Sequence, residues 1–220
     1  MVREMDRFLA NVALFKRLSP SERQRLAATA REKRYAKGET IFRAGDPADA
    51  VCIVKEGRVH LMHFLEGGQA STTCVMTNGE TFCCLPALDR QPYPVDAIAA
   101  VDSTVVRIPT GAFHELLEKN PSFLQETLCL FCDRLRQVEH RSCMAYDSVE
   151  RRLTQVLVTL SKKFGHTIPL TKHELAELAN TTVETTIRVV SQLKKQGVLK
   201  TSRGSTTIVK PDKLQDLAAS

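Results

Sequence analysis

Residues 171–209 read TKHELAELANTTVETTIRVVSQLKKQGVLKTSRGSTTIV and decide the fold of the C-terminal third of the chain. Thr171 and Glu174 have the T-x-x-E spacing of a capping box, which predicts a helix that starts at the next residue. The same spacing recurs at Thr181 and Glu184, and it predicts a second helix directly after the first. Two short capped helices joined by a tight turn are typical of a helix-turn-helix.

The second helix is expected to run to Lys195 and to end at Gly197, with an inward face formed by Ile187, Val190 and Leu193. In the following residues, 199–209, Arg203 and Gly204 separate Lys200 from a β-branched run. This pattern predicts a β-hairpin with these two residues at its tip. The whole segment is therefore a predicted winged helix-turn-helix.

A helix-turn-helix places the N-terminal end of its second helix in the major groove of DNA. The exposed candidates for base contact are Thr182, Val183, Glu184 and Arg188. Arg188 can donate two hydrogen bonds to guanine, Glu184 can accept one from a cytosine amino group, and Val183 can contact a thymine methyl. The alternatives are that Glu184 only completes its capping box and that Arg188 contacts only phosphate.

The net positive charge of the chain comes entirely from its C-terminal third. Residues 148–220 hold twelve Lys or Arg against six Asp or Glu, whereas nineteen of each cancel in residues 1–147. Basic side chains displace counterions from phosphates, so double-stranded DNA is the expected partner. The candidates for the DNA backbone are Thr171, Lys172, His173, Lys194, Lys195, Lys200 and Arg203, and the alternative for the charged ones is a solvated surface.

The N-terminal part has a different pattern. Residues 5–35 are expected to form short helices, because Ser19 precedes Pro20 and Glu22 as at a helix start. Between residues 37 and 108, short apolar runs alternate with glycines, which predicts a small antiparallel roll or barrel and an α+β fold overall. The expected strands are 40–42, 51–54, 59–65, 71–76, 97–100 and 104–108.

A long helix is predicted after Pro121. Apolar or small residues recur there four and three positions apart, at Leu124, Leu128, Phe131, Leu135, Val138, Ser142 and Ala145. This seam favours a partner helix, and a homodimer through residues 121–145 is the working hypothesis; the alternative is that the helix packs on its own domain. Another helix is expected from Asp147 to about Phe164, with Gly165 as its stop.

The length of 220 residues predicts more than one domain, with boundaries at 1–120, 121–147 and 148–220 for the roll, the long helix and the winged helix-turn-helix. No window approaches the ~20 uninterrupted apolar residues of a membrane span. Residues 1–10 lack the apolar core of a signal peptide. We therefore expect a cytoplasmic protein without a membrane partner.

The order of a glycine-punctuated roll, a long helix and the segment 181–188, TTVETTIR, resembles the family of the cyclic AMP receptor protein and the fumarate and nitrate reduction regulator (CRP/FNR). The resemblance covers nearly the whole chain. It implies an effector-responsive bacterial homodimer that binds palindromic DNA and contacts RNA polymerase. At position 183 the chain has Val and so resembles the fumarate and nitrate type, which implies TTGA-like half-sites. At position 187 it has Ile where that type has Ser, so the outer base of the half-site is left open.

The family binds a cyclic nucleotide after the position of Gly79, with a Glu on the ribose and an Arg on the phosphate. Here the Glu position falls on Cys84 and the Arg position near Pro94. A phosphate buried without an Arg or equivalent donors would be poorly compensated. Because the chain departs from the family at both positions, cyclic AMP is not expected as the effector, and the small effector is left unidentified.

Seven cysteines offer other sensing chemistry. None lies in residues 1–51, so the N-terminal iron–sulfur cysteine set of the oxygen-sensing member is not matched. Cys83 and Cys84 lie at the ligand position, where one could be a redox- or sulfur-responsive thiol or could bind a soft metal or metalloid. The other candidates are Cys52, Cys74, Cys129 and Cys132, and the alternative is that the thiols are inert core residues.

Haem is the second hypothesis for the sensor. Phe82 and Cys83 resemble the segment of the carbon-monoxide-sensing member whose Cys ligates ferric haem. Leu85 takes the place of the His ligand of that protein, so His60 or His63 would have to substitute for it. This alternative predicts a sensor of carbon monoxide or nitric oxide.

Two other classes of protein fit the sequence less well. The sequence holds no nucleophile elbow, phosphate loop, redox C-x-x-C beside a βαβ pattern or histidine–carboxylate cluster, so an enzyme is not expected. A cyclic-nucleotide-type docking module without DNA binding is the alternative of another class. The paired capping boxes and the basic C-terminal third argue against it.

Overall fold

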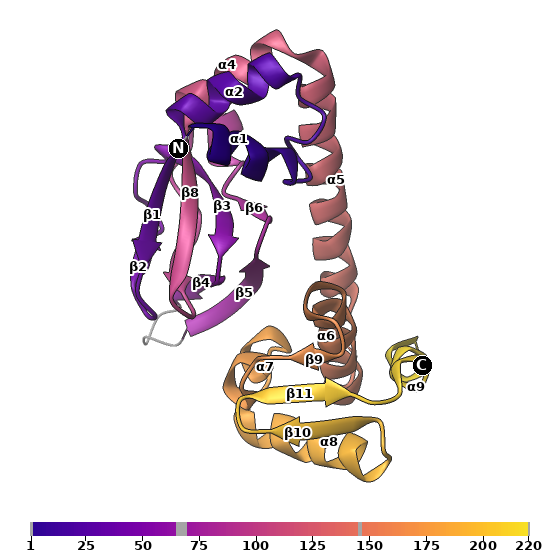
Figure 1. Cartoon of the computed structure of the whole chain (residues 1–220). Helices are drawn as coiled ribbons and strands as arrows, with labels where there is room; N and C mark the ends of the chain where they lie inside the picture. The colour runs from indigo at the N-terminus through magenta and orange to yellow at the C-terminus, as the bar shows by residue number, and fades with distance from the viewer. Residues whose placement is uncertain (1, 65–69, 145–146, 220) are drawn as a thin grey trace. The chain divides into compact units, whose positions relative to one another are not determined.

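The computed structural model describes residues 2–64, 70–144 and 147–219. The chain divides into two compact units, Met1–Phe64 with Cys74–Arg136 and Leu65–Thr73 with Gln137–Ser220 (Figure 1). No helix in the described ranges combines the length and the apolar character that a membrane crossing requires.

Two four-stranded sheets form the roll of the first unit. One sheet has the order β1 (Arg31–Tyr35), β8 (Ser103–Pro109), β3 (Ala50–Glu56) and β6 (Thr81–Phe82). The other has the order β2 (Thr40–Phe42), β7 (Asp96–Ala99), β4 (Arg58–Phe64) and β5 (Ala70–Thr77). The predicted α+β fold with an antiparallel roll is confirmed.

The six expected strands correspond to β2, β3, β4, β5, β7 and β8, but β1 and β6 were not predicted. The prediction of helix up to residue 35 is wrong, because residues 31–35 pair antiparallel with β8 from Arg31↔Arg107 to Tyr35↔Ser103. Four of the five side chains of β1 are exposed and charged, so the strand lacks the alternating apolar pattern of a half-buried strand. Pairing with the buried β8, which local sequence does not reveal, decides its conformation.

Side chains alternate across the β1-β8-β3-β6 sheet and create two cores. Val51, Ile53, Val106 and Ile108 face the helix-side core, which also contains Leu9, Phe15, Leu26, Phe113 and Phe123. The helices on that side are α1 (Val2–Ala10), α2 (Pro20–Thr29) and α4 (Thr110–Lys119) (Figure 1). Cys52, Val54 and Val105 point the other way, into what we call the roll interior, together with Phe42, Phe82 and Tyr93.

The predicted helix start at Ser19 is confirmed. Its hydroxyl accepts a hydrogen bond from the Glu22 N–H, and the Glu22 carboxylate accepts one from the Ser19 N–H at 2.9 Å. Leu26 on the same helix is buried in the helix-side core. A short helix, α3 (Pro86–Asp89), follows β6.

The long helix α5 runs from Pro121 to Met144, as predicted. The Asn120 side chain caps it by accepting a hydrogen bond from the Phe123 N–H at 2.9 Å. Four residues of the predicted seam are exposed: Leu124 by 38%, Leu128 by 52%, Leu135 by 58% and Val138 by 57%. Phe131 is half-buried, and the side chains of Ser142 and Ala145 lie outside the described residues. The seam is therefore an apolar stripe that the described chain leaves largely uncovered.

The second unit contains α6 (Val149–Phe164), β9 (Thr167–Ile168), α7 (Lys172–Leu178), α8 (Val183–Lys195), β10 (Leu199–Ser202), β11 (Ser205–Ile208) and α9 (Pro211–Ala219). Ser148 caps α6, which buries Leu153, Leu157 and Leu160, and Gly165 ends it with a positive φ. Helix α9 packs against α6, and β9 joins the hairpin as a third strand. The predicted α6 is confirmed; β9 and α9 were not predicted.

Candidate functional site

The first helix of the helix-turn-helix, α7, has the predicted capping box. The Thr171 hydroxyl accepts a hydrogen bond from the Glu174 N–H at 3.2 Å, and the Glu174 carboxylate accepts one from the Thr171 N–H at 2.6 Å. After α7, Asn180 adopts a left-handed conformation with a φ of 49°. Asn tolerates this region better than most residues, so the chain can turn sharply into the next helix.

The second helix, α8, begins one residue later than predicted. Its N-cap is Thr182, whose hydroxyl accepts a hydrogen bond from the Thr185 N–H at 3.2 Å. The predicted Thr181–Glu184 capping box is therefore wrong. The physical reason is that the Thr181 N–H donates to the Ala176 carbonyl at 3.0 Å, which keeps Thr181 in the turn that closes α7.

Glu184 consequently occupies the second position of α8 and is fully solvent-exposed. Hydrogen bonds from its own backbone N–H and from the Thr182 side chain hold the pKa of Glu184 below its ordinary value. The carboxylate is thus ionised at neutral pH and lies at the positive end of the helix dipole. As an ionised acceptor, it is suited to a base amino group.

The outward face of α8 carries Glu184, Ile187, Arg188 and Ser191, which are all exposed. Thr186, Val189, Val190 and Leu193 are buried on the opposite face. Within the described residues, the Arg188 guanidinium has no hydrogen bond or ion pair, so all its donors are available to a partner. Thr182 is exposed at the cap, and Val183 is half-buried.

The predicted packing of this helix is wrong at Ile187. It was expected to be buried, but its side chain is 49% exposed. The buried positions are spaced three, one and three residues apart, and Ile187 falls outside the arc that they define on a helix of 3.6 residues per turn. The inward apolar contact comes from Val189 instead.

The predicted wing is confirmed. Strands β10 and β11 pair from Leu199↔Ile208 to Ser202↔Ser205, with Arg203 and Gly204 at the tip. Gly204 has a φ of 74°, which favours glycine in such a tight turn. The hairpin lies alongside α8, which contacts β10 (Figure 1).

The basic residues around α8 differ in how accessible their charged groups are to a DNA phosphate. Lys194, Lys195, Lys200 and Arg203 are exposed. Lys172 is only half-buried, and its ammonium donates a hydrogen bond to the Thr206 hydroxyl of the wing at 2.7 Å. Burial lowers the pKa of Lys172. This side chain joins α7 to the wing in the structure, a role that the sequence did not indicate.

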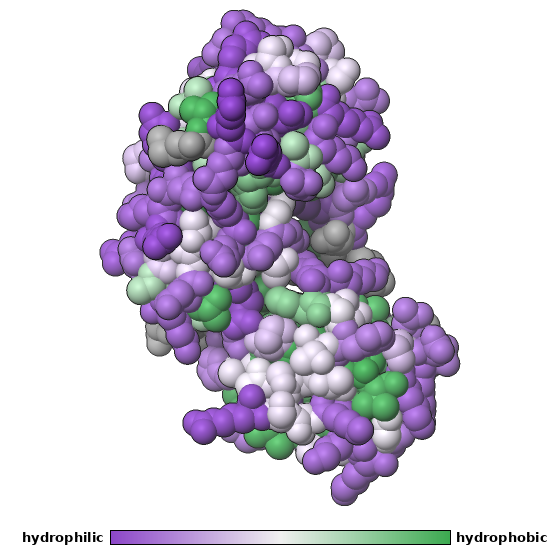
Figure 2. All heavy atoms as spheres, in the orientation of Figure 1, coloured by the Kyte–Doolittle hydropathy of each residue, from purple (hydrophilic) through white to green (hydrophobic). Residues whose placement is uncertain are grey.

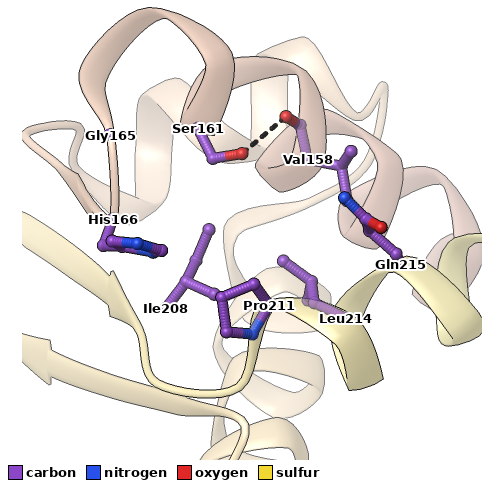
Figure 3. Close-up of a pocket in the computed structure, with 8 residues that line it drawn as sticks. All are labelled: Val158, Ser161, Gly165, His166, Ile208, Pro211, Leu214 and Gln215. Carbon is purple, nitrogen blue, oxygen red and sulfur yellow. Dashed lines mark hydrogen bonds between the residues drawn. The ribbon is translucent and has the colours of Figure 1, made fainter.

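A cavity of about 140 Å³ lies elsewhere in this unit, between α6, β11 and α9 (Figure 3). Ile208, Pro211 and Leu214 give it an apolar wall, and the Ser161 hydroxyl at its edge donates to the Val158 carbonyl at 2.8 Å. None of its lining residues belongs to α8. The cavity is therefore separate from the face that carries Glu184 and Arg188.

In the first unit, the two adjacent cysteines point into different cores, although they follow β6 and do not belong to a strand. Cys83 lies in the roll interior with Cys52, whereas Cys84 lies in the helix-side core. Cys83 has a φ of 58°, in the left-handed region that few residues other than glycine adopt. This backbone position ends β6, and it turns the chain toward α3.

All three thiols are shielded from water. Burial raises the pKa of Cys52 to about 12 and that of Cys84 to about 11, and it raises the pKa of Cys83 further. The Arg107 charge opposes this effect at Cys52, and the Arg134 charge opposes it at Cys83 and Cys84. Because burial outweighs both cations, the thiols are protonated at neutral pH and slow to react.

Sequence reasoning missed a polar network at one end of the roll. The Arg107 guanidinium lies 2.7 Å from the Asp49 carboxylate, and the Tyr93 hydroxyl donates to the same carboxylate at 3.0 Å. The Tyr93 ring stacks on Phe42 with a centroid distance of 3.8 Å. An arginine among the apolar residues of β8 was the signal that could have pointed to this network.

Among the described residues, the predicted haem and metal ligands lie in different places. His60 points away from the roll interior, because its neighbours Val59 and Leu61 face it, and His63 is exposed. Cys83 therefore has no predicted histidine across from it. No cluster of three or more His, Cys, Asp or Glu residues able to hold a metal ion occurs in the described ranges.

The remaining cysteines lie apart from Cys83 and Cys84. Cys74 on β5 packs at the edge of the roll interior. Cys129 and Cys132 are exposed on α5. All of these cysteines are free thiols in the structure.

Both units have counterparts among known proteins. Residues 32–120 match the model of the cyclic nucleotide-binding domain, and residues 151–217 match that of the Crp-like helix-turn-helix domain. The cyclic AMP receptor protein of Thermus thermophilus is 27% identical over 93% of this chain and 96% of its own length. The fumarate and nitrate reduction regulatory protein of Escherichia coli is 24% identical over 86% of this chain and 78% of its own.

Solved structures share the fold. FixK2 from Bradyrhizobium japonicum has a TM-score of 0.79 at 20% identity, covering 87% of this chain and 98% of its own. The catabolite activator protein of Thermus thermophilus has a TM-score of 0.54 at 26% identity, covering 94% and 98%. Because the two domain models match in the order of the roll and the winged helix-turn-helix, and because these relatives are regulators rather than enzymes, the chain belongs to the CRP/FNR family of DNA-binding transcription regulators.

Proposed function

We propose that this regulator acts as a homodimer on a palindromic DNA site with TTGA-like half-sites, one α8 helix entering the major groove at each half-site. The observation that carries the proposal is the outward face of α8, where an ionised Glu184 and an unpaired Arg188 are both exposed within the described part of the chain. Glu184 is suited to a cytosine amino group and Arg188 to guanine O6 and N7. The two side chains lie one turn apart, so they can contact neighbouring base pairs.

Three exposed cations support the entry of α8 into the major groove, because they lie on α8 and on the wing, where they can contact phosphates. These cations are Lys194, Lys200 and Arg203. Thr171 and Thr182 cap the two helices, and hydroxyls and N–H groups at helix N-termini bind phosphate. These residues position the domain on DNA without reading its sequence. Contact with RNA polymerase is the further expectation that family membership supports.

The dimer part of the proposal rests on α5. Leu128 and Leu135 are more than half exposed and lie on one stripe with Leu124 and Val138. A stripe with four-three spacing is buried by a second copy of the same helix in a parallel pair. A twofold axis along this pair would present two α8 helices, which is why a palindromic site is expected.

The experiment that tests the DNA proposal is selection from random DNA with the full chain, followed by affinity measurements on the recovered site. We expect a palindrome of TTGA-like half-sites. Arg188→Ala should weaken binding about 10- to 100-fold, the loss expected for a bidentate base contact. Lys213→Ala on α9, an exposed cation outside the helix-turn-helix, is the matched control. Recovery of a non-palindromic or unrelated motif would refute the half-site.

For the signal, we propose sensing by cysteine, with Cys83 and Cys52 as the pair in the roll interior. Both side chains lie in the core of the roll interior, and a Cys52 thiolate would raise the pKa of Cys83. A reactive sulfur species, an oxidant or a thiophilic metal or metalloid is the class of signal that such a pair would meet. Because both thiols are buried and protonated, we expect a weak oxidant to leave the pair unchanged.

DNA affinity tests this part separately. It should change when the full chain is treated with a persulfide donor, hydrogen peroxide or arsenite, and Cys83→Ser should abolish the change. Cys129→Ser, at an exposed thiol of α5, is the control. Cyclic AMP should leave the affinity unchanged. A Soret band in freshly purified protein would favour the haem alternative, and an unaltered affinity under every treatment would contradict sensing by cysteine.

A further inference from the structure

We infer that Ile187 is a specificity-determining residue that contacts the C5-methyl group of a thymine in each half-site. The inference deepens the proposed function and rests on it. Its starting point is the exposure of an isoleucine on the outward face of α8, between the two polar residues proposed to contact bases.

Ile187 shares the stripe of Glu184 and Arg188. It follows Glu184 by three positions and precedes Ser191 by four, so all four side chains project from one side of the helix. A helix that presents Glu184 and Arg188 to base edges therefore presents Ile187 to them as well. In the major groove, the thymine methyl is the apolar group that such a side chain can meet.

The exposure of Ile187 is not required by the packing of the unit. Thr186, Val189, Val190 and Leu193 already form the inward face, so an isoleucine at 187 adds nothing to the core. Of the large apolar side chains of the second unit that the structure describes, only Val138, Ile187 and Val209 are exposed. Val138 belongs to the seam of α5, which leaves Ile187 as the exposed apolar residue of the DNA-facing helix.

Apart from the seam of α5, the described residues include few large exposed apolar side chains. On the face of the molecule in Figure 2, hydrophilic residues predominate and hydrophobic ones form small groups. In the free protein, the exposed part of the Ile187 side chain is in contact with water, and covering it with an apolar group is favourable. A thymine methyl provides that cover at the site where Arg188 and Glu184 are already engaged.

The structure also favours Ile187 over the apolar neighbour that the sequence suggested. Val183 was the predicted thymine contact, but its side chain is half-buried at the start of α8. Ile187 is longer, and half of its surface is free. The apolar contact with the base edge is therefore assigned to Ile187.

The test uses the full chain and the site recovered by selection. Each thymine is replaced in turn by deoxyuridine, symmetrically in the two half-sites, which removes only the methyl group. Affinity is measured by fluorescence anisotropy for the wild type and for Ile187→Ala, Ile187→Val, Val183→Ala and Val209→Ala. Val209 is the matched control, because it is an exposed aliphatic residue of the same unit outside α8.

We expect one thymine position at which deoxyuridine weakens wild-type binding about fourfold per half-site, the effect of one buried methyl group. Ile187→Ala should bind the two duplexes equally, whereas Ile187→Val should keep part of the difference and Val209→Ala all of it. The inference is overturned if no thymine shows the effect, if Ile187→Ala retains it, or if Val183→Ala is the variant that loses it. Failure to select any sequence would instead overturn the proposed function.

Discussion

The guanidinium of Arg134 on α5 donates a hydrogen bond to the backbone carbonyl of Thr81 on β6. Thr81 lies two residues before Cys83, and Arg134 directly precedes Leu135 of the exposed seam. The bond therefore ties the strand that leads to the buried thiols to the helix proposed to form the dimer. A displacement of β6 would act on α5 through this contact.

Loss of the Arg134 bond should destabilise the first unit. Arg134→Ala removes a charged donor from a part-buried carbonyl, so the free energy of unfolding should fall by about 1–2 kcal/mol. Urea denaturation measures the change. Arg136→Ala is the control, because Arg136 pairs with Asp133 at 2.8 Å on an exposed surface where ion pairs contribute little. Equal effects of the two substitutions would argue against a structural role for the bond.

A charge in the seam should separate the proposed dimer. Leu135→Glu places a carboxylate on the stripe where two copies would bury apolar side chains, and sedimentation at micromolar concentration should show monomers. Gln125→Glu adds the same charge at an exposed position of α5 outside the seam and should leave the dimer intact. A wild type that sediments as a monomer would contradict the dimer itself.

The buried thiols should make stability decrease at alkaline pH. Burial raises the pKa of Cys84 from 9.0 to about 11, so the folded chain keeps a proton that the unfolded chain has released in this interval. The contribution is complete below pH 9 and is lost progressively as the pH rises toward 11, because unfolding then releases a proton.

Cys84→Ala tests this linkage. It should reduce the slope of unfolding free energy against pH above 9 by up to about 1.4 kcal/mol per pH unit, measured by urea denaturation. Cys129→Ala, at an exposed thiol, should keep the wild-type slope. Identical slopes in all three proteins would mean that Cys84 does not titrate with the fold.

A glycine supports the roll through close approach. Gly57 has a φ of 97°, and a Cβ there would lie 2.3 Å from the Ser103 hydroxyl oxygen and 2.7 Å from the Asp102 carbonyl oxygen. That hydroxyl accepts from the Arg58 N–H at 3.0 Å, so a side chain at 57 would also disturb this bond. Gly57→Ala should therefore destabilise the first unit by more than the backbone strain of a positive φ alone would.

Gly38→Ala provides the comparison. Gly38 has a similar φ of 84°, but a Cβ there would meet nothing within 4 Å. Its substitution should cost only the backbone strain of about 1–2 kcal/mol. Thermal unfolding of both variants measures the difference, and an equally stable Gly57→Ala would show that Ser103 can move aside.

Local signals in the sequence predicted much of this fold. The capping boxes at Ser19 and Thr171 and the hairpin tip at Arg203 are all present, because each depends on residues within a few positions. The second predicted capping box, at Thr181 and Glu184, does not form because of a backbone hydrogen bond in the turn that closes α7. The Thr181 N–H is already bonded to Ala176, so the cap moved to Thr182, and no spacing of residues reveals that bond.

Other features depend on contacts between distant segments. The charged strand β1 forms only against β8, and the Arg107–Asp49 pair joins residues 58 positions apart. The exposure of Ile187 was not predicted either, because Ile187 precedes Val190 by three positions, a spacing that is also typical of a buried helical face. Glu184 and Arg188 are exposed on the outward face of α8 as expected, whereas the position of Ile187 on that face was not predicted.

The exposed cysteines of α5 have a practical consequence. Cys129 and Cys132 lie one helical turn apart and face solvent, whereas Cys52, Cys83 and Cys84 are buried. A bifunctional spin label or fluorophore would therefore attach preferentially to this pair, at two points that fix its orientation. The unmodified chain thus supplies a rigid spectroscopic reporter on its longest helix, from which interhelical distances and rotations could be followed as the signal changes.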